Sequence, residues 1–212
     1  MTASVKVGVL DYGSGNLHSA CRALAAAGAE VELGSEPGDF ASSDALVVPG
    51  VGAFAACMAG LHQVGGDDLV RDWVAAGRKL LGICVGHQVL FARGVERGIQ
   101  ADGIGVFPGT VERLTATRLP HMGWNTVEVP RPAGVFEDLG ESRFYFVHSY
   151  GVHATDDDGT PSVPPDARIT WCEHEKDRFI AAVQWGSVTS TQFHPEKSGA
   201  AGAALLRHWL MS

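Results

Sequence analysis

The sequence predicts an α/β fold whose N-terminal half forms a mostly parallel sheet and whose C-terminal half adds antiparallel strands. Three observations support this prediction. Residues 5–10, 17–27 and 29–33 follow one another as an apolar run, a helical segment and a second strand. A strand that ends in a glycine-flanked turn surrounds Cys84. From Val106 onward, short β-branched and aromatic segments follow one another with little helix between them.

The length and composition are those of an ordinary globular chain. Its 212 residues are enough for one sizeable core and few for two, so residues 1–212 are expected to form a single domain. The hydrophobic share is 45%, and no apolar stretch approaches the ~20 residues that a membrane span requires. The chain starts directly with a strand, without a charged leader and a long apolar region, so we expect a soluble, unprocessed protein.

The charge and the cysteines exclude several function classes. A formal net charge of -8 without a basic cluster argues against nucleic acid or an anionic membrane as the partner. Cys21, Cys57, Cys84 and Cys172 share no metal-ligand or redox spacing, so neither a zinc site nor a disulfide framework is expected. Reduced thiols are typical of a cytoplasmic protein.

The first helix and its flanking strands can be assigned in order. Residues 5–10 are expected to form a central parallel strand, because such strands are continuously apolar. Asn16 is expected to cap the helix over residues 17–27, which stops at Gly28 before the strand over residues 29–33.

The loop after the first strand contains Gly13 and Gly15, which invites comparison with a nucleotide-binding turn. It lacks the third glycine of a dinucleotide motif and the lysine of a P-loop. No cofactor is therefore expected.

A third strand is expected over residues 44–48, followed by a loop with two flexible glycines, Pro49-Gly50-Val51-Gly52. This loop would lie beside the crevice at the carboxyl end of the sheet. An ordinary strand-to-helix turn is the alternative. Asp67 and Asp68 are then expected to start a helix that ends at Gly77. Its apolar face would consist of Leu69, Val70, Trp73 and Val74.

The strand over residues 79–84 ends at a cysteine with the features of a nucleophile. Gly82 and Gly86 leave room for a tight strand-to-helix turn, as in the Gly-x-Ser-x-Gly elbow of hydrolases, with sulfur in place of oxygen. Residues 89–92 are expected to be helical, and the N-terminus of a helix favours the thiolate form of a cysteine. The N–H of Val85 points where an oxyanion would form. In the alternative interpretation, Cys84 is a small buried apolar residue.

One histidine has the surroundings of a catalytic base. His194 ends a predicted strand over residues 188–194 and is followed by Pro195 and Glu196. Proline favours an extended His194, so the imidazole and the Glu196 carboxylate can lie on the same side. A nucleophilic cysteine needs such a base, and both groups lie at predicted strand ends, where open α/β sheets place their ligands. A His-Pro-Glu turn that only marks a surface loop is the alternative.

The second half is predicted to be antiparallel or mixed. After a glycine-rich link over residues 94–109, strands are expected at residues 110–114, 125–129, 142–150, 168–172, 179–185 and 188–194. Asp156, Asp157 and Asp158 lie in a predicted surface loop and are expected to be a solvated turn rather than a metal site. A helix over residues 200–210 closes the chain.

The stretches over residues 82–88 and 194–196 together resemble the class I glutamine amidotransferases, whose triad is Cys, His and Glu in that chain order. With four further stretches, the chain is similar, within that family, to the glutaminase subunits of imidazole glycerol phosphate synthase. The stretches span nearly the whole chain: Asp11-Tyr12-Gly13-Ser14-Gly15-Asn16-Leu17, Pro49-Gly50-Val51-Gly52-Ala53-Phe54, Gly82-Ile83-Cys84-Val85-Gly86-His87-Gln88, Pro120-His121-Met122-Gly123-Trp124-Asn125, Tyr145-Phe146-Val147-His148-Ser149-Tyr150 and His194-Pro195-Glu196. The resemblance implies a three-layer α/β/α arrangement. The family often has methionine where this chain has His87, and the sequence assigns His87 no role.

The resemblance implies that the chain hydrolyses glutamine to glutamate and ammonia without a metal. Cys84 would be the nucleophile, His194 the base, and Glu196 the group that orients the base. The oxyanion would be held by Val85 and by the loop at Val51 and Gly52, where the Val51 N–H becomes available only after a peptide reorients under control of the partner.

The resemblance also assigns Gln88, Ser149 and Tyr150 to the amino-acid end of glutamine. The spacing of Ser149 and Tyr150 alone favours a strand end with a half-buried tyrosine.

The implied partner is the cyclase of the synthase, which has the form of a (β/α)₈ barrel and makes a heterodimer with the glutaminase. It would use the ammonia to make imidazole glycerol phosphate and an aminoimidazole carboxamide ribotide in histidine biosynthesis. Asn16, Trp124 and Lys197 match stretches that the family places near this interface. For Lys197, an ordinary solvated lysine is an equal alternative.

Three other functions fit less well. A non-enzymatic relative would be expected to lose a triad position, and this chain keeps all three. A cysteine protease would not need residues 120–125. Residues 49–54 and 145–150 argue, on resemblance alone, against an amidotransferase of anthranilate or guanylate synthesis.

Overall fold

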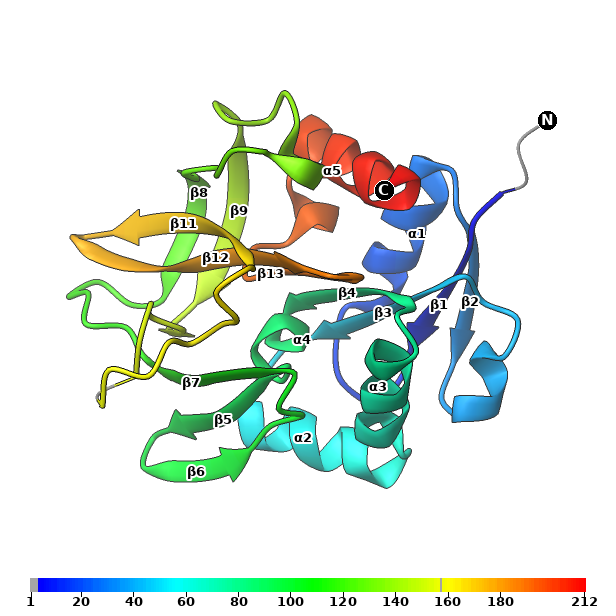
Figure 1. Cartoon of the computed structure of the whole chain (residues 1–212), viewed down its shortest axis with the longest axis horizontal. Helices are drawn as coiled ribbons and strands as arrows, with labels where there is room; N and C mark the ends of the chain where they lie inside the picture. Colours follow the sequence, from blue (N-terminus) through cyan, green and yellow to red (C-terminus); the bar gives the residue numbers. More distant parts are fainter. Residues whose placement is uncertain (1–3, 157) are drawn as a thin grey trace.

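A seven-stranded mixed sheet crosses the centre of the molecule (Figure 1). The computed structural model describes residues 4–156 and 158–212. The strand order is β11-β12-β13-β4-β3-β1-β2. The bounds of these strands are β1 (Lys6–Leu10), β2 (Glu30–Gly34), β3 (Ala45–Gly50), β4 (Lys79–Cys84), β11 (Arg168–His174), β12 (Asp177–Trp185) and β13 (Val188–Thr191).

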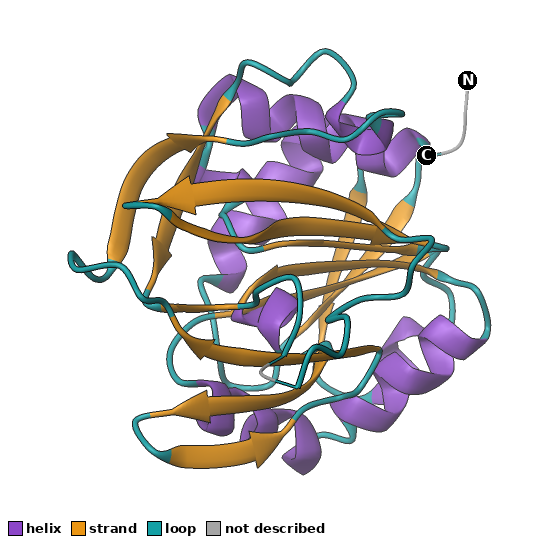
Figure 2. Cartoon of the chain, turned by 60° about the vertical axis from the view of Figure 1, so that its left-hand side comes forward, coloured by secondary structure: helices purple, strands orange, loops and turns teal. Residues whose placement is uncertain are grey.

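Helices cover both faces of this sheet (Figures 1 and 2). On one face α1 (Leu17–Ala27) packs against α5 (Gly199–Met211), and on the other α2 (Phe54–Gln63) packs against α3 (Gly66–Ala75). Single helical turns complete the set: α4 (Val85–Gln88) and the 3-10 helices η1 (Pro37–Phe40), η2 (Gly134–Phe136) and η3 (Pro195–Lys197). None of the helices in the described residues is long and apolar enough to cross a membrane.

Two smaller sheets extend the structure beside the carboxyl end of β4. One has the strand order β10-β7-β5-β6, and the other pairs β8 with β9 in antiparallel fashion. Their bounds are β5 (Phe91–Glu96), β6 (Ile99–Asp102), β7 (Phe107–Arg113), β8 (His121–Thr126), β9 (Arg143–His148) and β10 (Tyr150–Gly151). The predicted α/β fold, with a mostly parallel sheet and added antiparallel strands, is confirmed.

Parallel pairing brings three strand ends to one edge of the central sheet. β4 lies between β3 and β13, parallel to both, with Gly50 opposite Cys84 and Thr191 opposite Ile83. Because parallel strands end on the same side, the residues that follow them meet there. The loop after β3, the turn after β4 and the segment that leads to His194 therefore surround one site.

An aromatic core supports the segment that carries His194. Phe193 is fully buried and stacks on Phe144 with 4.3 Å between ring centroids. The rings of Phe136 and Phe146 meet the Phe193 ring edge to face. The His194 N–H also donates to the Tyr145 carbonyl at 2.9 Å, which fixes the backbone before the histidine side chain branches off.

A half-buried histidine, His153, joins the two larger sheets. His153 donates from Nδ1 to Glu112 on β7 at 2.7 Å and from Nε2 to Asp177 on β12 at 2.8 Å. Burial lowers the pKa of His153, but the hydrogen bonds to Glu112 and Asp177 outweigh it and leave that pKa above its ordinary value. The charged imidazole therefore holds the segment that follows β10.

Two expectations for the N-terminal half need correction. Asn16 stands at the N-cap position of α1, but its side chain makes no capping hydrogen bond. Pro49 and Gly50, expected in a loop, continue β3 because they still pair with Ile83 and Cys84. In addition, no helix is predicted from the sequence at α2, which begins at Phe54.

The segment after the cysteine turn was predicted wrongly. Residues 89–92 were expected to be helical, but α4 is one turn long and Phe91 begins β5. A four-residue apolar run does not distinguish a helix from a strand, and here Phe91 is buried against Phe107 of β7. The expected link over residues 94–109 contains the hairpin of β5 and β6, closed by Arg97 and Gly98, both with positive φ.

Further along the chain, the predicted strand over residues 125–129 lies earlier, at β8, because it pairs with β9 from His121 onward. The strand predicted over residues 188–194 ends at Thr191. Asp156 is not solvated as expected, since it accepts hydrogen bonds from the backbone and the hydroxyl of Thr110. The same expectation for Asp157 lies outside the described residues.

The His153 tie predicts a pH-dependent contribution to stability. A group whose pKa is raised by folding stabilises the folded state below its unfolded pKa of about 6.5, and this stabilisation is lost as the pH rises through the folded pKa. His153→Gln should lower the free energy of unfolding by about 1–2 kcal/mol at pH 6 and by less at pH 9. Urea unfolding at pH 6 and at pH 9 measures this loss of free energy. His18→Gln, at an exposed position, is the control. An equal loss at both pH values would contradict the prediction.

Candidate active site

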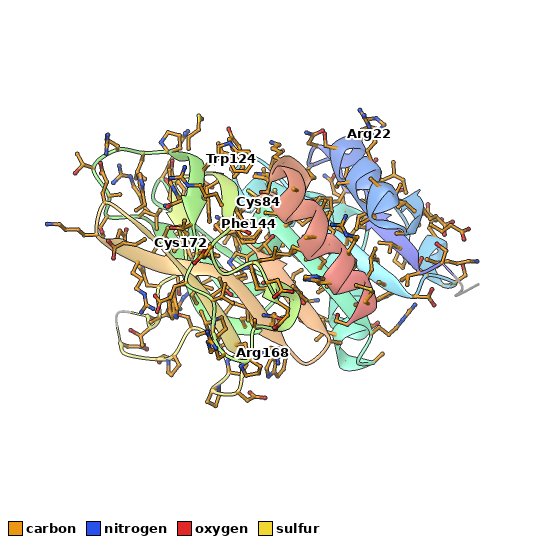
Figure 3. All side chains as sticks on the ribbon, turned by 90° about the horizontal axis from the view of Figure 1, so that it is seen from above. Arg22, Cys84, Trp124, Phe144, Arg168 and Cys172 are labelled. Carbon is orange, nitrogen blue, oxygen red and sulfur yellow. The ribbon has the colours of Figure 1, made fainter. Side chains whose placement is uncertain are left out.

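The cysteine at the end of β4 has a backbone conformation that few side chains adopt. Cys84 has φ 56° and ψ -112°, and α4 begins at the next residue. A non-glycine residue with positive φ is strained, so its surroundings must hold it in place. Cys84 is only 4% exposed and lies inside the molecule, whereas Trp124 lies toward its rim (Figure 3).

Three glycines allow this turn to pack against the neighbouring strand. A Cβ on Gly86 would lie 1.8 Å from the carbonyl oxygen of Val48, and one on Gly50 would lie 2.7 Å from the nitrogen of Gly86. A Cβ on Gly82 would lie 2.6 Å from the Gly86 carbonyl oxygen. These obstacles are backbone atoms in a close-packed interior, so they cannot move aside. The glycines thus permit the close approach of β3, β4 and α4.

The histidine and the glutamate predicted from the sequence form a buried pair. His194 Nδ1 lies 2.7 Å from Glu196 Oε1, and both side chains are almost completely inaccessible to solvent. Because the carboxylate can only accept, Nδ1 carries a proton and the other ring nitrogen faces away from Glu196. Nε2 makes no hydrogen bond to any described residue, although it is buried.

The thiol and the imidazole influence each other electrostatically. Burial lowers the pKa of His194, but the neighbouring Cys84 thiol and the Glu196 carboxylate outweigh this and raise the pKa to about 9. A buried imidazole that keeps its proton at neutral pH is the natural counter-ion of a thiolate, and it can later return that proton to a leaving group. The structure therefore brings Cys84, His194 and Glu196 together in the arrangement of a nucleophile, a base and an orienting group.

A cavity of about 220 Å³ opens onto the cysteine and the histidine. It is lined by Val51, Gly52, Cys84, Val85, Gln88, Glu96, Val147, His148, Ser149, Tyr150, His194 and Lys197. All the residues predicted to hold an oxyanion or the amino-acid end of a substrate are among them. Glu196 stands behind His194, outside the lining.

The two predicted oxyanion donors are in different states. Val85 is the first residue of α4, so its N–H has no acceptor within that helix. The N–H of Val51 donates to the Ser14 hydroxyl at 3.2 Å, and the same hydroxyl donates to the Val51 carbonyl at 2.7 Å. Val51 is thus engaged with the loop after β1.

Of the two glycines expected to make the loop after β3 flexible, only Gly52 has space around it. Gly52 has φ +98°, and no atom lies near the place of a Cβ. Gly50 belongs to β3, where it is enclosed by Gly86 and Tyr12. A reorientation of this loop therefore has its hinge at Val51 and Gly52.

Two of the three residues expected at the amino-acid end of a substrate, Gln88 and Tyr150, are hydrogen-bonded to each other. Gln88 Nε2 donates to the Tyr150 carbonyl and to Gln192 Oε1, both at 2.9 Å. Both of these hydrogen bonds use Nε2 of Gln88, and neither uses its Oε1. Ser149 and Tyr150 line the cavity as the chain passes from β9 to β10.

The three predicted interface residues lie around this site. Trp124 is 50% exposed and stands beside the exposed Met122 on the outer face of β8. Lys197 is exposed at the cavity that contains Cys84. Asn16 is exposed and lines a small neighbouring cavity together with Val51 and Glu196.

Four residues at the site were not found from the sequence. Glu96 lines the cavity and accepts from the Phe54 N–H at 2.9 Å, but it lies in the segment taken for a link. Ser14 and His148 lie within two of the stretches that carry the family resemblance, which implied no role for either residue. Gln192 is fully buried with its Nε2 4.0 Å from Cys84 Sγ. Its spacing of two from His194 on an extended segment was a signal that could have found it.

The structure gives His87 a packing role. It is completely buried on α4, its Nδ1 lies 2.8 Å from the Ser190 hydroxyl on β13, and its ring meets Phe91 edge to face. Burial lowers its pKa to about 3, so it is neutral. Within residues 4–156 and 158–212, no group of three or more His, Cys, Asp or Glu side chains is arranged to hold a metal ion.

Comparison with known proteins places these features in a family. The family model described as "Glutamine amidotransferase class-I" matches residues 8–212. The imidazole glycerol phosphate synthase subunit HisH of Cutibacterium acnes is 55% identical over 210 residues, which cover 99% of this chain and 98% of that protein. The subunit of the same name from Mycobacterium tuberculosis is 52% identical over 211 residues, which cover 99% of this chain and 98% of the relative.

Solved structures share the fold. A crystal structure of a glutamine amidotransferase has a TM-score of 0.74 at 24% identity and covers 97% of both chains. The structure of PurLQS from Thermotoga maritima has a TM-score of 0.70 at 17% identity, and the match covers 99% of this chain and 98% of the other. At these identities the likeness concerns the fold alone.

The close packing at the cysteine turn predicts a strong effect of one methyl group. Gly86→Ala would place a Cβ against the Val48 carbonyl, so either β3 or α4 must move. We expect a loss of about 3 kcal/mol or more in the free energy of unfolding, or failure to fold. Gly38→Ala in η1 has open space and should change stability by less than about 0.5 kcal/mol. Thermal and urea unfolding of both variants tests this, and a Gly86→Ala variant as stable as the wild type would refute it.

Proposed function

Because the chain belongs to the class I glutamine amidotransferase family, we propose that it is the glutaminase subunit of an imidazole glycerol phosphate synthase. In this role it hydrolyses glutamine to glutamate and ammonia and passes the ammonia to a cyclase subunit of histidine biosynthesis. The observation that carries the proposal is the strained Cys84 turn, which shares one buried site with the His194–Glu196 pair. Relatives above 50% identity over nearly their full length carry the same subunit name.

The proposed reaction follows from this arrangement. In the resting pair the thiol proton lies on His194 Nε2, and Cys84 Sγ attacks the carbon of the glutamine side-chain amide as a thiolate. The tetrahedral intermediate collapses as His194 gives the proton to the nitrogen, and ammonia leaves. His194 then takes a proton from a water molecule, which attacks the thioester, and glutamate and the thiolate–imidazolium pair result. Glu196 keeps Nδ1 protonated throughout, so Nε2 is always the nitrogen that exchanges protons.

We assign stabilisation of the oxyanion to the N–H groups of Val85 and Val51, with Gly52 as the hinge. Loss of one such donor typically lowers the rate by ~10²–10³. The engagement of the Val51 N–H by Ser14 supports a resting state in which the second donor is withheld. Docking of the cyclase subunit would release it.

The amino-acid end of glutamine carries an ammonium and a carboxylate. We assign the ammonium to Glu96, because its carboxylate lines the cavity together with Cys84. Gln88 Oε1 and the segment at Ser149 and Tyr150 would hold the remaining polar groups. With this assignment the side-chain amide of the substrate lies at Cys84.

We propose that the cyclase partner, a (β/α)₈ barrel, docks on the face formed by Asn16, Trp124 and Lys197 to make a heterodimer. The exposed apolar side chains of Trp124 and Met122 support this assignment, since contact surfaces are enriched in Trp and Met. Direct transfer protects ammonia from protonation in bulk water. We place the protein in the cytoplasm, because the cysteines at 21, 57, 84 and 172 are free thiols, which suit a reducing compartment.

Replacement of the nucleophile tests the proposed chemistry. Cys84→Ala should reduce glutamate release from glutamine by at least about 10⁴-fold, because no thioester can form. The measurement is glutamate release by the purified chain, alone and with the cyclase in the presence of its nucleotide ligand. The wild type should be strongly stimulated by the partner. Turnover retained by Cys84→Ala would overturn the nucleophile assignment, and glutamine hydrolysis without stimulation would point to a different synthase.

The Ser14 contact predicts a gain of activity. Ser14→Ala removes the group that holds both the N–H and the carbonyl of Val51, so the loop should sample the active orientation more often. We expect glutamate release without the partner to rise about 10-fold, which is less than the full value of an oxyanion donor. Ser35→Ala, at an exposed position, is the control and should leave the rate unchanged. A basal rate that does not rise would show that Ser14 does not restrain the loop.

A further inference from the structure

Two buried histidines form a hydrogen-bonded chain that ends at the cavity. His121 and His148 face each other across β8 and β9, with His121 Nδ1 3.0 Å from His148 Nε2. His148 Nδ1 lies 2.8 Å from the Tyr150 carbonyl, and Asn125 Nδ2 lies 3.2 Å from His121 Nε2. The chain therefore runs Asn125, His121, His148, Tyr150, from the inner side of β8 to the cavity that contains Cys84.

The direction of every bond in this chain is determined by its ends. The Tyr150 carbonyl can only accept, so His148 Nδ1 carries a proton. His148 Nε2 then carries a lone pair and accepts a hydrogen bond from His121 Nδ1–H. The remaining lone pair, on His121 Nε2, accepts from the Asn125 amide, whose second proton goes to the Glu173 carbonyl. All four polar side-chain atoms of the two rings are satisfied only if both histidines are neutral with the proton on Nδ1.

The surroundings keep both rings neutral and fixed. His121 and His148 are 4% and 7% exposed, and both pack against Phe146 and Phe179. Burial lowers the pKa of His121 to about 4 and that of His148 to about 3. His174, stacked on His121 at 4.3 Å between centroids, contributes in the same direction. At neutral pH neither ring takes up a second proton that would break the chain.

The Tyr150 carbonyl at the end of the chain also holds a cavity-lining side chain. It accepts from Gln88 Nε2 at 2.9 Å, on the helical turn that follows Cys84. One peptide oxygen therefore joins two groups from opposite sides, His148 from β9 and Gln88 from α4. If the peptide group that contains the Tyr150 carbonyl rotated, its oxygen would lose the hydrogen bonds from both His148 and Gln88.

We propose that His121 and His148 are positioning residues for glutamine: their chain holds the Tyr150 carbonyl, and through it sets Gln88, Ser149 and Tyr150 for substrate binding. This inference rests on the proposed function, because it deepens the account of how that site binds its substrate. Neither histidine is required to exchange a proton with glutamine. Their effect is on where the binding groups stand.

Steady-state kinetics of glutamate release in the complex with the cyclase subunit tests the role. His148→Phe keeps the volume of the ring but leaves the Tyr150 carbonyl without this donor, so KM for glutamine should rise about 10-fold with a smaller change in kcat. His148→Asn places an amide N–H near the position of Nδ1 and should stay within about 3-fold of the wild type. His174→Phe keeps the stack on His121 but lies outside the chain, so it is the matched control with unchanged KM.

Imidazole ¹⁵N spectra of the full chain provide a readout that packing alone would not move. The wild type should show His121 and His148 as neutral rings protonated on Nδ1, although free neutral histidine favours Nε2. In His121→Phe, His148 should stay protonated on Nδ1, because the Tyr150 carbonyl still accepts from it, while the His148 Nε2 resonance moves as the hydrogen bond from His121 is lost, with an accompanying rise in KM. If His148→Phe does not fold, His121→Phe and His148→Asn carry the kinetic test.

The outcomes separate this inference from the proposed function. Normal KM and kcat in His148→Phe, in a wild-type complex that hydrolyses glutamine, would overturn the positioning role and leave the glutaminase assignment standing. His148 protonated on Nε2 in the wild type would overturn the chain itself. No glutamate release by the wild-type complex would overturn the proposed function and the positioning role together.

Discussion

The close approach of the turn after β4 to strand β3 is the contact on which the site depends. Gly86 lies against the Val48 carbonyl with no space for a side chain, and Gly50 and Gly82 complete the contact. Because this contact with β3 holds the turn in place, Cys84 keeps a strained backbone conformation with positive φ. The same contact holds Cys84 and Val85 at the wall of one cavity. Strain at one residue is thus balanced by packing at three others.

A second constraint places His194 beside the cavity that Cys84 lines. β13 runs parallel to β4, so His194 emerges at the same edge of the sheet as Cys84. Phe193 anchors the segment in the aromatic core, and Glu196 orients the ring at 2.7 Å. Burial alone would make an imidazole neutral, as it does for His87. At His194 the neighbouring Cys84 and the hydrogen bond to Glu196 reverse that direction.

The two sides of the cavity are held with different strength. On the side of β9 and β10, the Tyr150 carbonyl receives donors from His148 and Gln88 within a buried network. On the side of β3, Val51 is 40% exposed and is held mainly by the hydroxyl of Ser14. A rigid side suits recognition of a constant amino-acid group, whereas a lightly held loop suits control. The different functions proposed for the two sides follow from this difference in restraint.

Local patterns in the sequence determined the α/β class, the strand that ends at Cys84, the helix over residues 17–27 with its stop at Gly28, and the His194–Glu196 pair. These features depend on residues a few positions apart, where spacing and backbone preference decide. Family resemblance, rather than spacing, supplied the cavity residues and the substrate. Only the tertiary structure decided that Phe91 begins a strand, that Gly50 is packed rather than flexible, and that His121 and His148 belong to one hydrogen-bonded chain. Each of these depends on contacts between segments far apart in the chain, which local pattern does not encode.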